Sequence, residues 1–497
     1  MEKADVLVIG SGVSGLFFAL KAAQQNPHLS IVVMAKSSSN NTNTRYAQGG
    51  IAVVRDQESD SFEKHIEDTY NAGGKIGDRK VIEMVVKQAP ERLEELLNFN
   101  ISLDENKEGE LDLGLEGGHS AHRIVHYKDI TGLEIQTKLL AQIALNPSIT
   151  LCENISVVDL IPDVHNPKIC RGAYYYSHES GELKTFIAKC VILCTGGCGQ
   201  VFTYSTNPEI ATGDGVAMAY RMGAEIRDMR YIQFHPTALY EADKNPSFLI
   251  SEAVRGFGAY VVNARGERFL FDHDPAGELA TRDLVSNAIG AELKKSGEKT
   301  VFLDARHLDQ DAFYAHFPTI SDYCKSIGLH MAKDLIPIVP VAHYQCGGIQ
   351  VDMHAKTSIE NLYAIGECSH SGLHGKNRLA SNSLLEALVY AHQCASYIAT
   401  QCQADYCEDP LPKLPFHISK KTGNSNRELM RELKSAMTSL YTEHAEINPI
   451  LKRITDMEKD AVKALDKPFL HWDEIEWRNI CQTALIIVKD LAENQVN

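Results

Sequence analysis

The sequence predicts an α/β protein with an inserted α+β domain and a helical domain towards its C-terminal end. Near the N-terminus, a short apolar strand leads directly into a glycine-rich loop and then into a helical pattern. Two later apolar strands also end in glycine, one near residue 195 and one near residue 366. The segment between these two strands is richer in loops and charges, and the last part of the chain has helical periodicity.

The first unit is Rossmann-like. Residues 5–9, DVLVI, are typical of a parallel strand that is buried on both faces, and GSGVSG follows at residues 10–15. The helical pattern LFFALKAAQQ comes next, and LSIVVMAK at residues 29–36 is the second strand. In such a unit the glycines allow a tight turn and a close approach to a pyrophosphate, whose charge the helix N-terminus attracts. This segment therefore predicts a bound dinucleotide.

The strand ends indicate which dinucleotide is bound. An NAD-binding unit has Asp or Glu at the end of its second strand, where this chain has Ala35 and Lys36. Residues 190–199, CVILCTGGCG, and residues 361–369, NLYAIGECS, supply two more strand ends, the second of which contains Glu367. A cofactor that meets three strand ends, and whose ribityl chain offers a hydroxyl to a late glutamate, fits FAD better than NAD.

The chain divides into three predicted domains. An FAD-binding domain comprises residues 1–235 and 346–405, and a capping domain comprises the inserted residues 236–345. Three prolines in EDPLPKLP, residues 408–415, indicate a linker. Residues 416–497 then form a C-terminal helical domain, in which apolar residues recur at helical spacing.

The composition excludes several classes of function. The formal net charge of −16 opposes binding to nucleic acid and to anionic membrane surfaces. No uninterrupted apolar run reaches the ~18 residues of a membrane span, and the N-terminal apolar stretch lacks the features of a signal peptide. The 12 cysteines include no CxxC pair, so we expect free thiols and no metal site. Together these features predict a cytoplasmic protein.

Four cationic or hydrogen-bonding residues lie beside glycine, proline or a predicted turn. They are His235, Arg282, His343 and Arg378. A small dicarboxylate has two anionic ends, each of which suits a bidentate arginine or a histidine donor. Taken singly, each residue has an ordinary structural explanation, such as a loop histidine or a surface ion pair.

The ordered motifs resemble the flavoprotein family of succinate dehydrogenase and fumarate reductase. The resemblance extends over about residues 4–490, and within the family the pattern is most similar to the branch that oxidises L-aspartate. The motifs that carry the resemblance are GSGVSG, YAQGGIA, HxxDTYNAG, ATGDGVAMAYRMGA, QFHPT, HYQCGG and NRLASNSLLE. So many motifs in the family's order make a highly specific signal.

The resemblance implies which residues bind FAD. The glycine loop and Lys36 would contact the ADP half, and the segment from Asn43 to Gly50 would line the pyrophosphate and the isoalloxazine ring. The full implied set is Ser11, Gly12, Val13, Ser14, Gly15, Lys36, Asn43, Thr44, Arg45, Tyr46, Ala47, Gln48, Gly49, Gly50, Asp214, Glu367, Ser383 and Leu384.

The resemblance also implies a substrate site. His235, His343 and Arg378 would hold the substrate carboxylates, the two histidines acting as catalytic residues together with Arg282. Arg282 would be the proton-transfer residue, although a guanidinium normally remains protonated. The other expected substrate contacts are Glu116, His119, Ser120, Gln233 and Ser251.

Two departures distinguish this chain within the family. Members that link FAD covalently have a histidine four residues before the alanine of AQGG, where this chain has Asn43, so we expect non-covalent FAD. The dicarboxylate enzymes have an apolar residue before the paired glycines of the substrate loop, where this chain has Glu116. A carboxylate there would pair with the ammonium group that distinguishes L-aspartate from succinate, and it would be costly to bury against a bare methylene.

The resemblance therefore implies FAD-dependent oxidation of L-aspartate to iminoaspartate. Electrons would pass to O2, giving H2O2, or to fumarate, and the product would feed quinolinate formation in NAD biosynthesis, with quinolinate synthase as a candidate partner. The alternative within the family is a fumarate reductase or succinate dehydrogenase type of flavoprotein, against which Asn43 and Glu116 argue. A flavoprotein that acts on RNA is disfavoured by the net charge, and an inert flavin-binding scaffold by the four polar residues described above.

Overall fold

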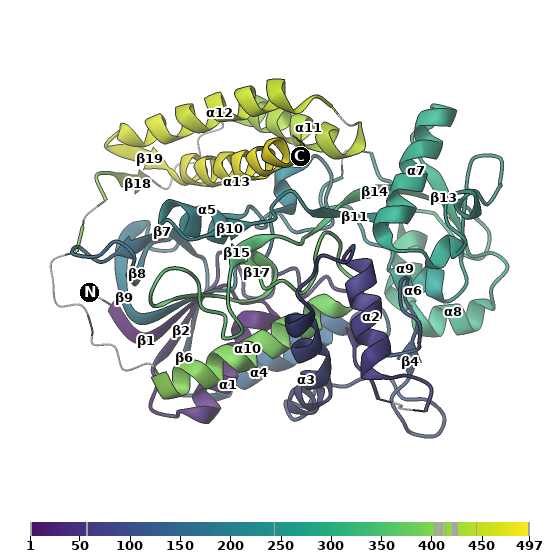
Figure 1. The fold of residues 1–497 in the computed structure, drawn as a ribbon, viewed down its shortest axis with the longest axis horizontal. Coiled ribbons are helices and arrows are strands. Elements are labelled where there is room, and N and C mark those ends of the chain that lie inside the picture. Colours follow the sequence, from purple (N-terminus) through teal and green to yellow (C-terminus); the bar gives the residue numbers. More distant parts are fainter. Residues whose placement is uncertain are drawn as a thin grey trace.

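The structure is a computed structural model in which residues 2–55, 58–242, 244–401, 406, 411–412, 414–419, 426–443 and 445–495 are described. It has three layers, with a helical layer from the end of the chain on one side of a central sheet (Figure 1). On the other side lie α1 (Val13–Gln25), α3 (Arg79–Leu97), α4 (Thr131–Leu145) and α10 (Asn382–Gln401). The inserted segment lies at one end of these layers (Figure 1). The predicted linker and the boundary at residue 405 fall largely on residues outside the described part.

The central sheet contains five parallel strands. In spatial order these are β6 (Ile149–Cys152), β2 (Ile31–Met34), β1 (Glu2–Ile9), β9 (Glu182–Leu193) and β16 (Leu362–Ala364). The strands predicted around residues 5–9, 29–36, 190–199 and 361–369 are therefore neighbours in one sheet, which confirms the predicted α/β fold. Because parallel strands place their carboxyl ends at one edge, the glycines that follow β1, β9 and β16 meet there.

Two antiparallel strands extend the first half of β9. They are β8 (Cys170–Ser177) and β7 (Ile155–Pro162). On the opposite side of the sheet from the C-terminal helices, α1 (Val13–Gln25) packs against α10 (Asn382–Gln401) and α4 (Thr131–Leu145). Ten residues of α1 are buried, including Phe17 and Phe18, so this helix belongs to the main hydrophobic core.

The inserted segment has its own antiparallel sheet and hydrophobic cluster. The sheet order is β11 (Ile232–Leu239), β14 (Ile336–Gln345), β13 (Val301–Asp304) and β12 (Tyr260–Val262). Its helices are α6 (Glu252–Gly256), α7 (Arg282–Ser296), α8 (Gln310–His316) and α9 (Pro318–Ser326). Because β11 begins before residue 236, the predicted boundary of the capping domain passes through a strand.

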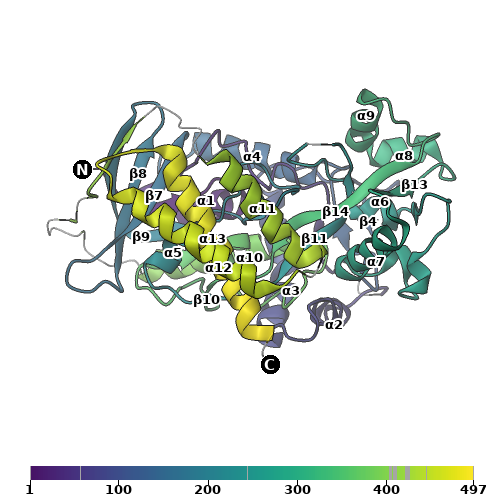
Figure 2. The ribbon, with the colours of Figure 1, turned by 90° about the horizontal axis from the view of Figure 1, so that it is seen from above.

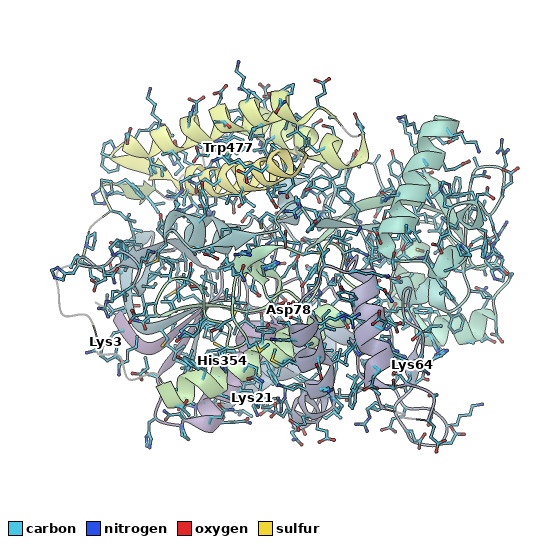
Figure 3. The ribbon with its side chains drawn as sticks, viewed as in Figure 1. Lys3, Lys21, Lys64, Asp78, His354 and Trp477 are labelled. Atoms are coloured by element: carbon cyan, nitrogen blue, oxygen red, sulfur yellow. The ribbon has the colours of Figure 1, made fainter. Side chains whose placement is uncertain are left out.

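The last part of the chain supplies the helical layer. It consists of α11 (Arg427–Thr442), α12 (Ile447–Lys463) and α13 (Trp472–Gln495), which cross the body diagonally (Figure 2). Trp477, labelled in Figure 3, lies on α13 in this helical layer and is 5% exposed. No helix in the described residues is long and apolar enough to cross a membrane.

The remaining elements are short strands and connecting helices. They are β3 (Ile51–Ala52), α2 (Phe62–Ala72), α3 (Arg79–Leu97), β4 (Leu113–Gly114), β5 (Ile124–Val125), α5 (Asp214–Arg221), β10 (Ile226–Arg227), β15 (Gly348–Gln350), β17 (Ser369–His370), β18 (His417–Ser419) and β19 (Phe469–His471).

Candidate active site

One large cavity lies between the carboxyl edge of the central sheet and the inserted sheet. Its volume is about 370 Å³, within the range of small-molecule sites. All the residues predicted for the cofactor and the substrate line it except Gly15, Arg45, His119, Ser120 and Gln233. The cavity thus joins segments that are more than 300 residues apart in sequence.

The dinucleotide end of the cavity depends on the first glycine loop. Gly10 has φ +116°, and a Cβ there would lie 2.1 Å from the carbonyl oxygen of Cys194. A Cβ at Gly15 would lie 2.2 Å from the carbonyl oxygen of Gly10, so the role of Gly15 is close packing beneath the loop. The N-terminus of α1 at Gly12 faces the cavity, and its first N–H, that of Val13, donates to a side chain, Thr44 Oγ1 at 3.0 Å. The positive end of the helix suits a phosphate ligand.

The flavin end contains buried polar groups without partners. Asn43 donates a hydrogen bond from Nδ2 to Glu367 Oε2 at 2.9 Å, but Asn43 Oδ1 has no partner. The buried oxygens Gln48 Oε1 and Thr195 Oγ1, on residues that line the same cavity, also lack partners. Buried polar atoms are usually hydrogen-bonded, so these atoms fit a polar ring system such as that of FAD.

Lys36 and Asp214 both line the cavity, and α13 contacts them from the helical layer. Lys36 Nζ pairs with Asp214 at 2.8 Å and with Glu476 of α13 at 2.6 Å. Burial opposes the charge of Lys36, but these two carboxylates raise its pKa above the usual value. Asn479 of α13 donates a hydrogen bond to the second oxygen of Asp214 at 2.9 Å. The helical layer therefore contacts residues of the cofactor site.

The substrate end brings the four predicted polar residues together. The rings of His235 and His343 lie 4.9 Å apart, centroid to centroid. Arg282 Nη1 and Arg378 Nη2 both donate to Gln233 Oε1, at 2.9 and 3.1 Å. Gln233 thus supports both guanidinium groups from behind and does not line the cavity.

The two histidines are neutral donors or acceptors at physiological pH. Burial, with the positive charge of Arg282 next in importance, holds the pKa of His235 and of His343 well below the ordinary value. His235 Nδ1 accepts a hydrogen bond from the Thr237 backbone N–H at 3.2 Å. The proton of the neutral ring therefore lies on His235 Nε2, a buried atom without a partner. A carboxylate in the cavity can accept this hydrogen bond.

Arg378 is a buried cation that forms no ion pair with a carboxylate in the described part of the chain. Besides Gln233, it donates from Nη1 to Ser383 Oγ at 3.2 Å, and its Nε has no partner. Burial, followed by the charge of Arg282, lowers its pKa to about 10, so it remains protonated at neutral pH. Its uncompensated charge suits an anionic ligand.

Arg282 is held by Glu252. Its Nε donates to Glu252 Oε2 at 2.5 Å, and the other oxygen of Glu252 pairs with Arg255 at 3.1 Å. Glu252 is 1% exposed and lines the cavity next to Ser251, whose hydroxyl caps α6 by accepting from Ala253 N at 3.3 Å.

Glu116 is the second carboxylate of the substrate end. It is 2% exposed, and its Oε2 accepts a hydrogen bond from Ser381 Oγ. Burial and the nearby charge of Glu252 raise its pKa, although Arg282 and the Ser381 hydroxyl oppose that shift. The wall of the cavity therefore contains both guanidinium groups, which suit carboxylates, and the buried carboxyl group of Glu116, which suits a cation.

Comparisons with known proteins identify the family. Residues 5–384 match the model of the FAD binding domain family. The chain is 38% identical to the L-aspartate oxidase of Yersinia pestis, over 99% of this chain and 94% of the relative, and 38% identical to that of Pseudomonas aeruginosa, over 99% and 93%. This chain belongs to the L-aspartate oxidases.

Solved structures of the wider flavoprotein family share its fold. A single-site mutant of the E. coli quinol fumarate reductase FrdA superposes with a TM-score of 0.83 at 27% identity, over 98% of this chain and 89% of that chain. Sdh1 of Mycobacterium smegmatis in complex with UQ1 has a TM-score of 0.81 at 29% identity, over 98% and 87%.

In this L-aspartate oxidase family member, the expected direct substrate contacts of His119 and Ser120 are corrected by the geometry. His119 Nε2 donates to the Ala380 carbonyl at 3.0 Å, and its Nδ1 accepts from Arg123 at 3.0 Å. Ser120 donates from its backbone N and its hydroxyl to Asp68, at 2.9 and 2.8 Å. These hydrogen bonds fasten the loop that carries Glu116, and neither residue lines the cavity.

Sequence reasoning missed four residues that contact the predicted ones. Glu252 stood next to Ser251 in LISEAVRG, where an acid three residues before an arginine was an available signal. Ser381 lay inside the NRLASNSLLE motif and could have been singled out. Glu476 and Asn479 lie on α13 and had no local signal, because their relation to the cofactor site arises only from the packing of the helical layer.

Proposed function

We propose that this protein oxidises L-aspartate to iminoaspartate at the cavity that Glu116 and Arg378 share, in the step that leads towards quinolinate and NAD. The observation that carries this proposal is that a buried carboxylate, Glu116, lines the same cavity as two neutral histidines and two arginines. L-Aspartate has two carboxylates and one ammonium, which is the complementary set of charges.

The cationic side of the cavity holds the substrate carboxylates. Arg378 offers a guanidinium group that has no carboxylate partner in the described part of the chain, and His235 offers a hydrogen bond from Nε2. Neither group has to break an interaction at its free nitrogen, Arg378 Nε or His235 Nε2, to bind a substrate carboxylate. His343 lies beside His235 and is oriented by Thr206, whose Oγ1 is 2.7 Å from His343 Nδ1. These preorganised groups would fix the orientation of the substrate α-carbon, and positioning of this kind is one of the contributions that protein groups make to cofactor chemistry.

Glu116 selects the amino group. An ammonium beside it favours its charged form, whereas a methylene leaves a buried carboxylate either unpaired or protonated. Bound FAD supplies the hydride acceptor for the reaction. Arg282, held by Glu252 and Gln233, is the proposed proton-transfer residue, and its attachment on two sides keeps its remaining donors directed at the cavity.

The electron acceptor and the partner belong to the same proposal. We infer O2, with release of H2O2, or fumarate as the acceptor, since fumarate has the same two carboxylates as the substrate. Quinolinate synthase is the proposed consumer of iminoaspartate, and support for it comes only from the resemblance. A respiratory type of flavoprotein is the weaker candidate, since the L-aspartate oxidases are more similar in sequence than the fumarate reductases.

The decisive experiment compares Glu116→Gln with the wild-type protein. We expect the wild type, loaded with FAD in air, to release H2O2 with L-aspartate and not with succinate. The variant should lose roughly 30-fold or more in kcat/KM for L-aspartate, because one side of a buried charge pair is removed. Succinate turnover with an artificial acceptor, without turnover of L-aspartate, would overturn the proposed function.

A further inference from the structure

Behind the substrate arginine lies a buried polar cluster whose role the proposed reaction leaves unexplained. The cluster consists of Tyr344, His374, Glu386 and Ser371, which are 8%, 5%, 1% and 8% exposed. Tyr344 lines the cavity, whereas the other three do not. Tyr344 follows His343 on β14, and Glu386 lies on α10, so the cluster joins the inserted sheet to a helix of the FAD-binding part.

The hydrogen bonds of the cluster converge on one carboxylate. The Tyr344 hydroxyl donates to Glu386 Oε2 at 3.3 Å and lies 3.2 Å from His374 Nε2. His374 Nε2 is 2.9 Å from the same oxygen, and the Ser371 hydroxyl donates to the other oxygen of Glu386. The hydroxyl end of Tyr344 is therefore fixed, because a buried carboxylate needs these donors.

The ring of Tyr344 lies under the guanidinium group of Arg378. The Arg378 Cζ is 4.2 Å from the centre of the ring, which is a cation–π distance. A carboxylate in this place would pair with the N–H groups of Arg378 and would compete with a substrate carboxylate. The face of an aromatic ring attracts the cation without accepting its N–H groups in the guanidinium plane, so those donors stay available to the cavity.

We propose that Tyr344 is a positioning residue for substrate binding, which supports Arg378 by its ring and is itself held by Glu386 and His374. Glu386 forms no ion pair with Arg378 and acts on it only through the Tyr344 hydroxyl, whose hydrogen bond it accepts. Gln233 and Ser383 fix the two ends of the guanidinium group, and the Tyr344 ring fixes its plane. This inference rests on the proposed function only in taking a dicarboxylate as the ligand of Arg378.

Two substitutions of Tyr344 separate the ring from the hydroxyl. Tyr344→Leu removes the aromatic face and should raise both the KM for L-aspartate and the dissociation constant of succinate roughly tenfold, with most of the effect on binding and little on kcat. Tyr344→Phe keeps the face and should change both constants by less than about threefold. A larger loss in the Phe variant than in the Leu variant would overturn the proposal, because it would make the hydroxyl the acting group.

The matched control is Tyr176→Phe. Tyr176 is a buried tyrosine on β8, far from the cluster in a separate hydrophobic core, and it does not line the cavity. It should leave the KM and the succinate dissociation constant unchanged. An equal rise in both constants in this control would reduce the role of Tyr344 to general packing.

The closing experiment is a double-mutant cycle that is read by binding. Succinate is titrated into oxidised, FAD-loaded wild type, Tyr344→Leu, Arg378→Lys and the double variant, and binding is followed by the change in flavin absorbance. We expect the Leu substitution to cost much less in the Arg378→Lys background, because the two residues act as a unit. Independent, multiplicative effects would overturn the inference. If the wild type does not turn over L-aspartate but Tyr344 and Arg378 remain coupled in succinate binding, the proposed function would be wrong and this inference would stand.

Discussion

At the scale of single residues, Glu367 makes the stability of the FAD-free protein depend on pH. Burial raises the pKa of Glu367 to about 7, although Gln345 N–H and Asn43 donate hydrogen bonds to it. Its pKa in the unfolded chain is about 4.3. As pH rises, the unfolded chain therefore releases the Glu367 proton before the folded protein does. The contribution of Glu367 to the free energy of unfolding is fully present below pH ~4.3 and is lost as pH rises through about 7.

The expected loss in the free energy of unfolding is about 4 kcal/mol at 1.36 kcal/mol per pKa unit. Glu367→Gln should remove this decline, so that the unfolding free energies at pH 5 and pH 8 differ less in the variant than in the wild type. Urea unfolding of the FAD-free proteins at the two pH values measures this difference. Glu108→Gln, at an exposed residue, is the control. Parallel pH curves for wild type and Glu367→Gln would contradict the predicted shift.

The substrate loop shows what residue types can and cannot reveal. A glutamate in place of an apolar residue was a sufficient reason to predict that Glu116 faces the substrate, and the cavity contains it. His119 and Ser120 are three and four residues away and carry equally suitable groups, but they face Asp68 and Arg123. The direction of a loop side chain depends on the helix behind the loop, and a short motif does not contain that information.

At the scale of elements, the substrate loop is anchored on α2 by an ion-pair cluster. Arg123 is fully buried and donates to both oxygens of Asp60 at 2.8 and 2.7 Å, and to Asp68 at 2.6 Å. Asp68 also accepts two hydrogen bonds from Ser120. The position of Glu116 therefore depends on a helix that does not itself touch the cavity.

Asp68→Asn should loosen this anchor. We expect a stability loss of about 1–3 kcal/mol and a roughly tenfold smaller preference for L-aspartate over succinate, because one acceptor of a charged network becomes a weaker one. The preference is measured by letting L-aspartate and succinate compete for binding to one FAD-loaded preparation of each protein. Glu67→Gln, an exposed neighbour on α2, is the control, and a stability loss without a change in preference would refute the anchoring role.

Elements with local signals were predictable, and those without them were not. The strands β1, β9 and β16 end in glycines that backbone geometry demands, so their sequence alone placed them at one site. The helix α12 has buried Ile454 and Met457 at helical spacing, the kind of local pattern that predicted a C-terminal helical domain. The orientation of the inserted sheet over the cavity depends on β11 and β14, whose pairing joins residues about 100 positions apart and has no local signature.

At the scale of the whole molecule, the helical layer and the cofactor site form one unit. Helix α13 reaches the site through Glu476, which pairs with Lys36, and through Asn479, which donates to Asp214. The Thr483 hydroxyl also lies 3.3 Å from the carbonyl of Gly213, which precedes α5. A ligand that orders Lys36 and Asp214 therefore also orders the helix that pairs with them, although Asn479 of α13 is 265 residues after Asp214 in the chain.

FAD should accordingly protect α13 from hydrogen exchange. A ligand at about 100 times its Kd stabilises the state that binds it by about 2.7 kcal/mol, and the elements that open with the site share this protection. We expect slower exchange on FAD binding in Trp472–Gln495 as well as in α1, and little change in α8 at the far end of the inserted domain. Glu476→Gln should reduce the protection of α13 more than that of α1, because it removes the ion pair with Lys36, whereas the exposed Glu493→Gln on the same helix should not. If FAD slows hydrogen exchange in α1 but not in α13 of the wild type, the helical layer would contact the site without being stabilised by FAD binding.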